Sequence, residues 1–289
     1  MPSVRQIRRR IRSVENTAKI TNAMSMIAAS KMRRAQEIAL NARPYAEHMR
    51  VLLSDLAAQP QDEDQIHPLL KRREIKKAQL ILITPDRGLT GGLNINVNRR
   101  AGQFIVEEQK KDISLNVVAI GKKGRDFMAR TGQDLRGVFV DMDDRPTLAD
   151  TTPISRIVID DYASREVDAV YLAYGQFVST TVQTPVVQSL LPVDPAELDP
   201  KKAVGYIYEP SAIEVLSALL PRFVEVQVYH AMLEAQASEQ SSRMVAMRNA
   251  TDNANVMVDD LTLEMNKVRQ DTITKELLDI IGGAAAVEG

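Results

Sequence analysis

The sequence has no cysteine and no tryptophan, and aromatic residues make up only 4% of its 289 residues. Without cysteine, neither a disulfide framework nor a thiolate metal site can form. The three histidines, His48, His67 and His230, are scattered and make a poor metal-binding set. No apolar run approaches the ~20 residues that span a bilayer, and the N-terminus lacks the apolar core of a secretory signal. We therefore expect a protein of a reducing compartment that would be held at any membrane by other subunits.

Glycine and proline are absent from a long stretch near the C-terminus, Arg222–Ile281. Stepping alternately four and three residues along it traces a mostly apolar stripe. The stripe consists of Val226, His230, Leu233, Ala237, Gln240, Met244, Met247, Thr251, Ala254, Val258, Leu261, Met265, Val268 and Thr272. A period of 3.5 sustained over this length predicts a left-handed coiled coil about 90 Å long. Such a helix needs a partner for part of its length.

The segment Ser3–Arg43 also lacks glycine and proline and carries a second, narrower stripe. This stripe consists of Ile7, Ile11, Val14, Ala18, Thr21, Ser25, Ala28, Met32, Ala35, Ala39 and Ala42. Its small residues would let a facing helix approach closely, and the larger side chains of the C-terminal stripe could fill the space. We therefore predict an antiparallel coiled coil between helices in 1–58 and 210–287 of one chain. Two separate coiled coils, each formed with another copy, remain an alternative.

Three prolines are expected to shape the helices. Pro44, with Tyr45, should kink or interrupt the N-terminal helix, and Pro221 should break the start of the C-terminal one. A shorter helix in the middle of the chain should be capped by Thr152, with Pro153 in its first turn.

Ten of the thirteen glycines lie between Gly88 and Gly205, so the middle of the chain has a different architecture. Short apolar runs alternate there with turns and helical patterns, which is typical of an α/β domain. The expected strands are residues 79–84, 115–120, 138–141 and 169–174, with a final extended edge at 178–193. The predicted fold class is therefore α plus α/β, with a Rossmann-like domain in 75–205 inserted between the two long helices.

A glycine-containing loop follows the first expected strand and includes Asp86, Arg87, Gly88, Gly91 and Gly92. Glycines at the start of a helix can expose backbone N–H groups to a phosphate. The loop lacks the Lys and Ser or Thr of a P-loop and does not match G-x-G-x-x-G. We therefore favour a structural or protein-binding loop over a nucleotide site. No catalytic set follows from residue spacing, and no catalytic, cofactor-binding or metal-binding residue is predicted.

The net charge of −1 hides an uneven distribution, because residues 1–50 hold eleven Lys or Arg against three Glu. Arg8, Arg9, Arg10 and Arg12 could face nucleic acid, anionic lipid or acidic protein loops. A solvated basic face without a specific partner remains an equal alternative.

Four segments together resemble one known family, the gamma subunit of F-type ATP synthases. Residues 273–286 (ITKELLDIIGGAAA) are similar to its C-terminal signature, and 237–253 resemble the preceding part of the same helix. Residues 20–33 resemble its N-terminal helix, and 86–94 resemble its glycine-containing loop. The four matches occur in the family's order over nearly the whole chain.

The resemblance implies the central shaft of a rotary motor. Such a shaft couples proton flow through the membrane sector to ATP synthesis or hydrolysis in the catalytic sector and regulates ATPase activity, without being catalytic itself. The implied partners are the alpha and beta subunits of the catalytic ring, the epsilon subunit and the membrane c-ring, with one copy per complex, no nucleic acid and no cofactor. The implied location is peripheral, on the cytoplasmic face of a bacterial cell membrane.

The resemblance also assigns roles to individual residues. Residues that resemble contacts with the catalytic subunits are Lys19, Met24, Arg243, Gln270, Thr274, Glu276 and, within an apolar sleeve, Leu278. Residues that resemble the contact with the rotor ring are Tyr206, Tyr208 and Glu209.

Two other function classes remain open. A regulatory coiled-coil protein with a nucleotide-sensing α/β domain would bind a nucleotide when isolated. The stalk subunit of a vacuolar or archaeal-type ATPase lacks an equivalent α/β insertion, so the middle domain counts against that class.

Overall fold

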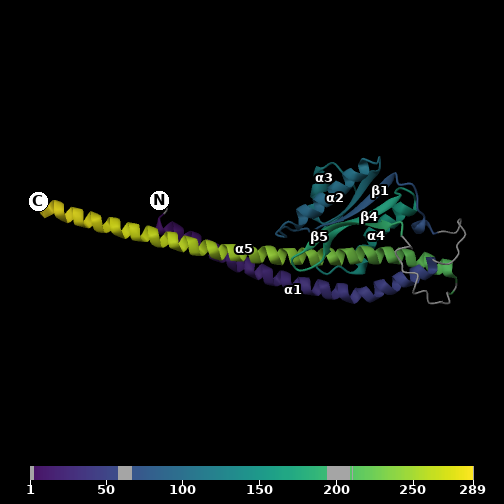
Figure 1. Cartoon of the computed structure of the whole chain (residues 1–289), viewed down its shortest axis with the longest axis horizontal. Helices are drawn as coiled ribbons and strands as arrows, with labels where there is room; N and C mark the ends of the chain where they lie inside the picture. Colours follow the sequence, from purple (N-terminus) through teal and green to yellow (C-terminus); the bar gives the residue numbers. More distant parts are fainter. Residues whose placement is uncertain (1–2, 58–66, 194–208, 210, 289) are drawn as a thin grey trace. The chain divides into compact units, whose positions relative to one another are not determined.

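The structure is a computed structural model that describes residues 3–57, 67–193, 209 and 211–288. It divides into two units, one formed by 1–27 with 244–289 and the other by 28–243, and each is described by itself. Two long helices, α1 (Val4–Ala57) and α5 (Ala212–Glu288), contribute residues to both units (Figure 1). Within the part of the chain that the structure describes, no helix is long and apolar enough to cross a membrane.

The larger unit is built around a five-stranded sheet with the order β3-β2-β1-β4-β5. Its strands are β1 (Lys77–Ile83), β2 (Ser114–Ile120), β3 (Asp134–Phe139), β4 (Ala169–Phe177) and β5 (Gln183–Leu191). The first four run parallel, and β5 runs antiparallel to β4. All residues of β1 after Lys77 are buried, as expected for the central strand of a sheet covered on both faces.

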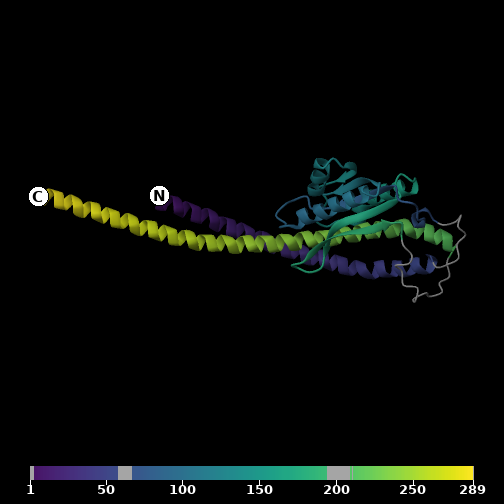
Figure 2. The same ribbon diagram turned by 45° about the horizontal axis from the view of Figure 1, so that its top comes forward.

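Helices cover both faces of this sheet (Figure 2). One face packs against α2 (Leu93–Gln109) and α3 (Lys122–Arg130), around buried residues such as Val97 and Met128. The other face packs against α4 (Leu148–Ala163), a short 3₁₀ turn at Pro68–Leu70, and residues of α1 and α5. The α5 helix therefore forms part of the core of the α/β unit.

The structure corrects the expected start of α4. The helix begins at Leu148, and its N-cap is Thr147 rather than Thr152. The Thr147 backbone N–H donates to Asp150 Oδ2 at 2.7 Å, which completes a capping box. Pro153 consequently lies in the second turn of the helix.

The two prolines of the long helices do not interrupt them. α1 continues through Pro44 to Ala57, and α5 begins at Ala212, before Pro221. A proline removes one backbone hydrogen bond from a helix. Next to Pro221 this loss is offset by packing, because Leu220 and Val224 are fully buried in the core. The expected break at the start of the last helix was therefore wrong.

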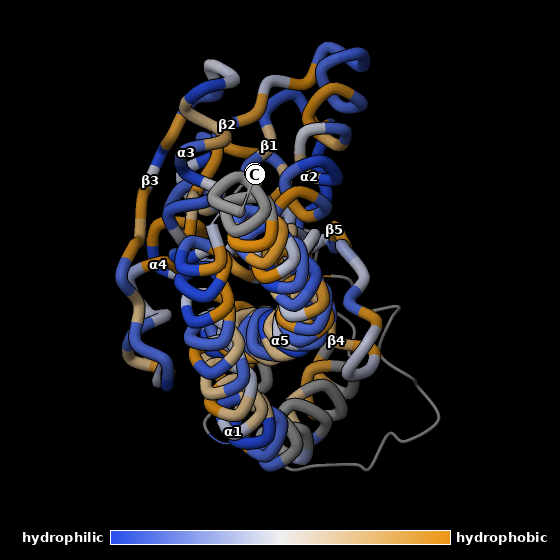
Figure 3. The backbone as a smooth tube through the Cα atoms, turned by 90° about the vertical axis from the view of Figure 1, so that its left-hand side faces the viewer, coloured by the Kyte–Doolittle hydropathy of each residue, from blue (hydrophilic) through white to orange (hydrophobic). Residues whose placement is uncertain are grey.

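The smaller unit is an antiparallel pair of helix segments from α1 and α5. Thr21 Oγ1 lies 2.6 Å from Thr251 Oγ1, and Ser25 Oγ donates to the Met244 carbonyl oxygen at 3.2 Å. Contacting residue numbers rise on one helix as they fall on the other, so the segments run in opposite directions. Hydrophobic and hydrophilic residues alternate at short intervals along both helices (Figure 3). The predicted pairing of both terminal helices within one chain is confirmed.

Candidate functional site

The seam of the helix pair follows the stripes expected from the sequence. On α1, Ile7, Ala18 and Thr21 are buried, and on α5, Met247 and Ala254 are buried. Around these positions lie exposed side chains, most of them polar or charged and some apolar, such as Ile20 and Val256. The seam is therefore narrow, and most of the surface of both helices in this unit is open to other molecules.

The end of α5 carries apolar side chains that no described residue of the unit covers. The two helices are antiparallel, so counting the same number of residues from the Thr21–Thr251 contact, backward along α1 and forward along α5, pairs Val4 with Val268. Val4 is the first residue of α1. Beyond Val268 the helix continues, and all residues from Arg269 to Ile281 are exposed. The large apolar ones, with exposed fractions between 45% and 67%, are Ile273, Leu277, Leu278, Ile280 and Ile281. An exposed apolar surface of this kind is typical of a protein-binding site. We call residues 273–281 the tip.

A second open surface is the basic face of α1. Arg8, Arg9, Arg10 and Arg12 are exposed, and none forms an ion pair or side-chain hydrogen bond with another residue that the structure describes. Their charges are therefore available to an acidic partner. Lys19 is exposed one turn or more further along the same helix.

The other predicted contact residues of the smaller unit are also accessible. Met24 is half-buried beside the seam, whereas Gln270, Thr274 and Glu276 are exposed on α5. Leu278 is exposed within the tip. The structure thus gathers Gln270, Thr274, Glu276 and Leu278 at one end of α5, while Lys19 and Met24 lie on α1.

Arg243 has a different environment, because it belongs to the larger unit and its side chain is only 12% exposed. Its guanidinium donates to Glu239 Oε1 at 2.6 Å and to the Gly88 carbonyl oxygen at 3.4 Å. Burial raises the pKa of Glu239, and the nearby Arg243 charge partly opposes that rise. Sequence reasoning did not foresee that Arg243 would lie against the glycine-containing loop. A contact between Arg243 and another subunit stays a prediction.

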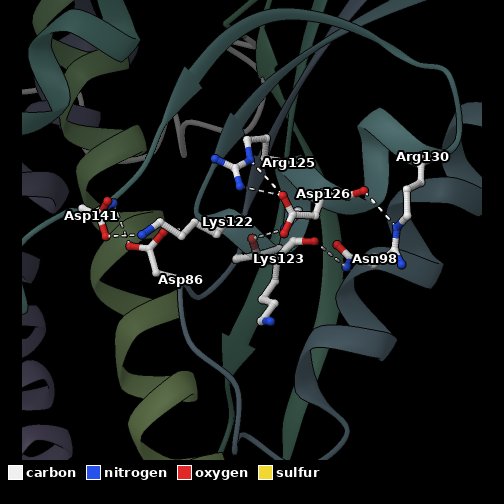
Figure 4. Close-up of polar contacts among 10 residues, drawn as sticks. Asp86, Asn98, Lys122, Lys123, Arg125, Asp126, Arg130 and Asp141 are labelled. Atoms are coloured by element: carbon white, nitrogen blue, oxygen red, sulfur yellow. Dashed lines mark hydrogen bonds and ion pairs between the residues drawn. The ribbon is translucent and has the colours of Figure 1, made fainter.

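The glycine-containing loop is held by hydrogen bonds on several sides. The Asp86 carboxylate accepts from the backbone N–H groups of Lys122 and Asp141, both at 2.9 Å (Figure 4). The Lys122 ammonium in turn lies 2.6 Å from Asp141 Oδ1. Asp86 thereby ties together the segments that follow β1, β2 and β3. This geometry supports a structural role for Asp86.

The loop is also tied to α5. Ser242 Oγ donates to the Thr90 carbonyl oxygen at 2.7 Å, next to the Arg243 contact with Gly88. Gly91 has a φ of 53°, in the left-handed region that favours glycine. The sequence did not point to Lys122, Asp141 or Ser242, although the first two follow strands at the carboxyl edge of the sheet.

A pocket of about 310 Å³ opens at this carboxyl edge, where Rossmann folds bind nucleotides. Its charged lining consists of Arg87 and the carboxylates Asp86, Asp141, Asp143, Asp144 and Glu239. An acidic lining repels phosphate. The cations Lys122, Lys31 and Arg243 are already paired with Asp141, Asp144 and Glu239, so they are not free to bind a phosphate. The pocket therefore disfavours a nucleotide.

No set of three or more His, Asp or Glu side chains in the described ranges lies close enough to hold a metal ion. Of the residues expected at the rotor ring, Tyr206 and Tyr208 lie outside the described residues. Glu209 is an exposed bend residue before α5.

Comparisons with known proteins decide the family. Residues 3–287 match a family model described as ATP synthase. A protein of Dehalococcoides mccartyi named ATP synthase gamma chain is 55% identical over 287 residues, covering 99% of this chain and 100% of the relative. One of the same name from Roseiflexus castenholzii is 53% identical, covering 99% of both chains. The chain belongs to the ATP synthase gamma chain family.

Solved structures agree with this assignment. A chain from the central stalk and c-ring of the Tetrahymena thermophila mitochondrial ATP synthase is 26% identical, with a TM-score of 0.61 over 80% of this chain and 99% of that one. A chain of the Euglena gracilis mitochondrial enzyme is 20% identical, with a TM-score of 0.68 over 98% and 94%, and so shares the fold. The gamma chain family, the fold class and a central-stalk role are confirmed. A stalk subunit of the vacuolar type and a separate regulatory protein are both disfavoured by these full-length matches.

Proposed function

We propose that the chain acts as the rotor shaft of an ATP synthase. It couples ion flow through the membrane sector to ATP synthesis or hydrolysis in catalytic sites that belong to other chains, and it carries no catalytic site itself. The observation that carries this proposal is the tip of α5. Five large apolar side chains there have no covering partner among the described residues of the unit, so a surrounding sleeve of other subunits would bury them.

The mechanism follows from the asymmetry of the helix pair. A shaft can drive several sites into different states only if it makes different contacts with each of them. The pair offers such differences, because α1 presents Arg8, Arg9 and Arg10 while the tip of α5 presents apolar side chains. A contact that favours one state of a catalytic site would also regulate ATP hydrolysis.

The close pairing of the helices suits the transmission of torque. Small residues such as Ala18 and Ala254 are buried in the seam, and the Thr21–Thr251 hydrogen bond fixes the register across it. Slippage of one helix along the other would break this bond and expose the seam. The shaft can therefore turn as a unit.

The predicted contact residues would bind two groups of partners. Lys19, Met24, Gln270, Thr274, Glu276 and Leu278 would contact the alpha and beta subunits, with Arg243 at the edge of the α/β unit. Glu209, with Tyr206 and Tyr208, would contact the c-ring, and the epsilon subunit would bind alongside. The chain would lie peripherally at the cytoplasmic face of a bacterial membrane, as a single copy per complex.

Co-purification from native membranes tests this function. An affinity-tagged chain should be recovered from detergent-solubilised membranes with a hexameric ATPase and a small membrane ring, whereas membranes with the untagged chain should yield neither. Recovery of the tagged chain alone, or with nucleic acid, would overturn the proposal.

A further inference from the structure

Helices α2 and α3 form a groove on the sheet face opposite α4. The groove has a volume of about 900 Å³ and is lined by these two helices and the residues at their ends. Phe127 of α3 lies against Gly102 of α2, where an added Cβ would stand 3.5 Å from the ring. The absence of a side chain at Gly102 therefore keeps the groove open beside an aromatic ring.

One stripe of α2 borders the groove along its length. Ile95, Arg99, Gly102, Val106 and Lys110 follow each other at spacings of four, three, four and four, so they share one side of the helix. Ile95 is 62% exposed and Val106 is 50% exposed. Apolar and cationic side chains thus alternate along an accessible surface.

The charge of the groove is strongly one-sided. Its cations are Arg99, Lys110, Lys123 and Arg130, and its single carboxylate is Glu107. Glu107 already pairs with Arg100 at 3.5 Å. Arg99 and Lys110 form no ion pair or side-chain hydrogen bond with any residue that the structure describes. This surface complements an acidic partner and repels a basic one.

Two asparagine side chains beside the groove have buried amide oxygens. Asn98 is 9% exposed, and its Nδ2 donates to the Lys123 carbonyl oxygen at 3.3 Å (Figure 4). That bond fixes the side-chain amide and leaves Oδ1 buried with no donor, and Asn94 Oδ1 is in the same state. Unsatisfied buried acceptors are uncommon in folded proteins. Because both oxygens are covered by this chain, a bound partner would not reach them, and the expectation of an occupant rests on the apolar stripe and the charge of the groove.

We propose that the groove between α2 and α3 binds an acidic amphipathic helix of a partner protein. Leucine-like side chains of that helix would pack against Ile95, Phe127 and Val106, while flanking Asp or Glu would pair with Arg99 and Lys110. The stripe from Ile95 to Lys110 measures about 22 Å, which matches a partner helix of about four turns. The proposal goes beyond the shaft function, which rests on the terminal helices.

A binding titration with the full chain tests the proposal. The probe is a fluorescent synthetic helix of about 16 residues with leucines at helical spacing and glutamates on both flanks, and binding is measured by fluorescence anisotropy. Arg99→Glu combined with Lys110→Glu should weaken binding at least about tenfold at low salt, because two attractive contacts become repulsive. Arg156→Glu, at an exposed position of α4, is the matched control and should bind as the unchanged chain does.

Three outcomes would overturn the proposal. The first is equal binding of the probe to the double variant, which would place the peptide elsewhere, for example on the tip. The second is equal binding of a probe with lysine in place of every glutamate. The third is a result in which the unchanged chain binds anionic phospholipid vesicles and the double variant does not, while both bind the peptide probe equally. That result would identify a membrane contact. Co-purification of the double variant with the hexameric ATPase separates a failed groove from a failed shaft.

Discussion

The α5 helix carries the same heptad stripe in both units, yet its surroundings in the two units differ. Before Met244 it is enclosed by the α/β unit, and residues on several sides of it are buried. They are Ala231, Met232, Leu233, Ala237, Ser238, Gln240 and Ser241. From Met244 onward the only buried residues that the structure describes, Met247 and Ala254, lie on the stripe, and from Arg269 to Ile281 every residue is exposed. A heptad pattern thus identifies the buried face of a helix but not how much else encloses it.

The residues beside the stripe reflect this difference. In the enclosed segment they include small polar residues, since Ser238 and Ser241 are fully buried where β4 and the turn after it approach closely. A Cβ added to Gly175 would lie 3.7 Å from Ser238 Cβ, and Ser241 Oγ donates to the Thr180 carbonyl oxygen at 2.6 Å. At the tip the corresponding residues are large and apolar. The tip is therefore built for a surface that this unit does not provide.

The largest expected effect compares the same substitution in the two segments. Leu233→Ala removes a fully buried side chain from the larger unit and should lower the free energy of unfolding by about 3 kcal/mol. Leu277→Ala, at a position 54% exposed, should change the stability of the isolated chain by less than about 0.5 kcal/mol. Urea unfolding of both variants measures the difference. Similar losses in the two variants would mean that the tip is buried in the isolated chain.

The second largest expected effect is on assembly, for which the tip should be the sensitive segment. Leu278→Lys places a charge where a surrounding sleeve should be dry, at a cost of about 2 kcal/mol or more in binding. The isolated variant should unfold at the same urea concentration as the unchanged chain, because Leu278 is exposed. Its incorporation into the hexameric ATPase should fall, as measured by the yield of complex. Asn266→Lys, at an exposed polar position of α5 outside the predicted contacts, is the control.

Full incorporation and normal ATP-driven rotation of the Leu278→Lys complex would contradict an apolar sleeve. A loss of folding in the isolated variant would instead mean that the tip packs against its own chain.

Much of the fold was predictable because it depends on local patterns. The stripes named the seam positions Ile7, Thr21 and Thr251, and the apolar runs located β1, β2 and β4, because periodicity directly reflects which side is buried. The effect of the prolines was predicted wrongly because it depends on tertiary packing and not on a local pattern. Whether a helix tolerates Pro221 depends on the packing of Leu220 and Val224 in a core assembled from distant segments.

The candidate site was less predictable, because it too depends on contacts between distant segments. The exposure of Lys19 and Glu276 agrees with the helical pattern, but their contact roles were implied only by the family resemblance and stay a prediction. The burial of Arg243 against Gly88 depends on a contact between positions 155 residues apart. The α2–α3 groove also escaped sequence reasoning, although Ile95, Arg99, Val106 and Lys110 carry a visible alternation. An exposed apolar residue can be recognised only once the helix face is known.

A smaller effect tests the Arg243 contact through its pH dependence. Burial raises the pKa of Glu239 in the folded state, so the protonated form is stabilised at low pH and this stabilisation is lost as pH rises through the folded pKa. Arg243→Met removes the charge that opposes this shift, so the pKa should rise further. We expect a loss of about 1.5 kcal/mol at pH 8 that shrinks as pH is lowered to 5 and approaches the raised pKa of Glu239. Urea unfolding at both pH values measures it.

The control is Arg243→Met made in a chain that also carries Glu239→Gln, because a glutamine side chain cannot titrate. In that background the cost of Arg243→Met should be the same at pH 5 and pH 8. A pH dependence that persists there would assign the effect to a different group.

The smallest effect concerns the basic face of α1, which the helix pair leaves in solvent. Replacing Arg8, Arg9 and Arg10 by Gln should leave the isolated chain as stable as before, because none of the three pairs with a described residue and exposed charges contribute little to folding. Coupling of ATP hydrolysis to rotation in the assembled complex should weaken, by less than about 1 kcal/mol per charge, and most at low salt where screening is weakest. The same three substitutions at Arg33, Arg34 and Arg156, which are also exposed, serve as the control. The measurement is the ATPase rate and rotation yield of reconstituted complexes across a salt series. An effect that grew with salt concentration could not come from attraction between these arginines and acidic partners.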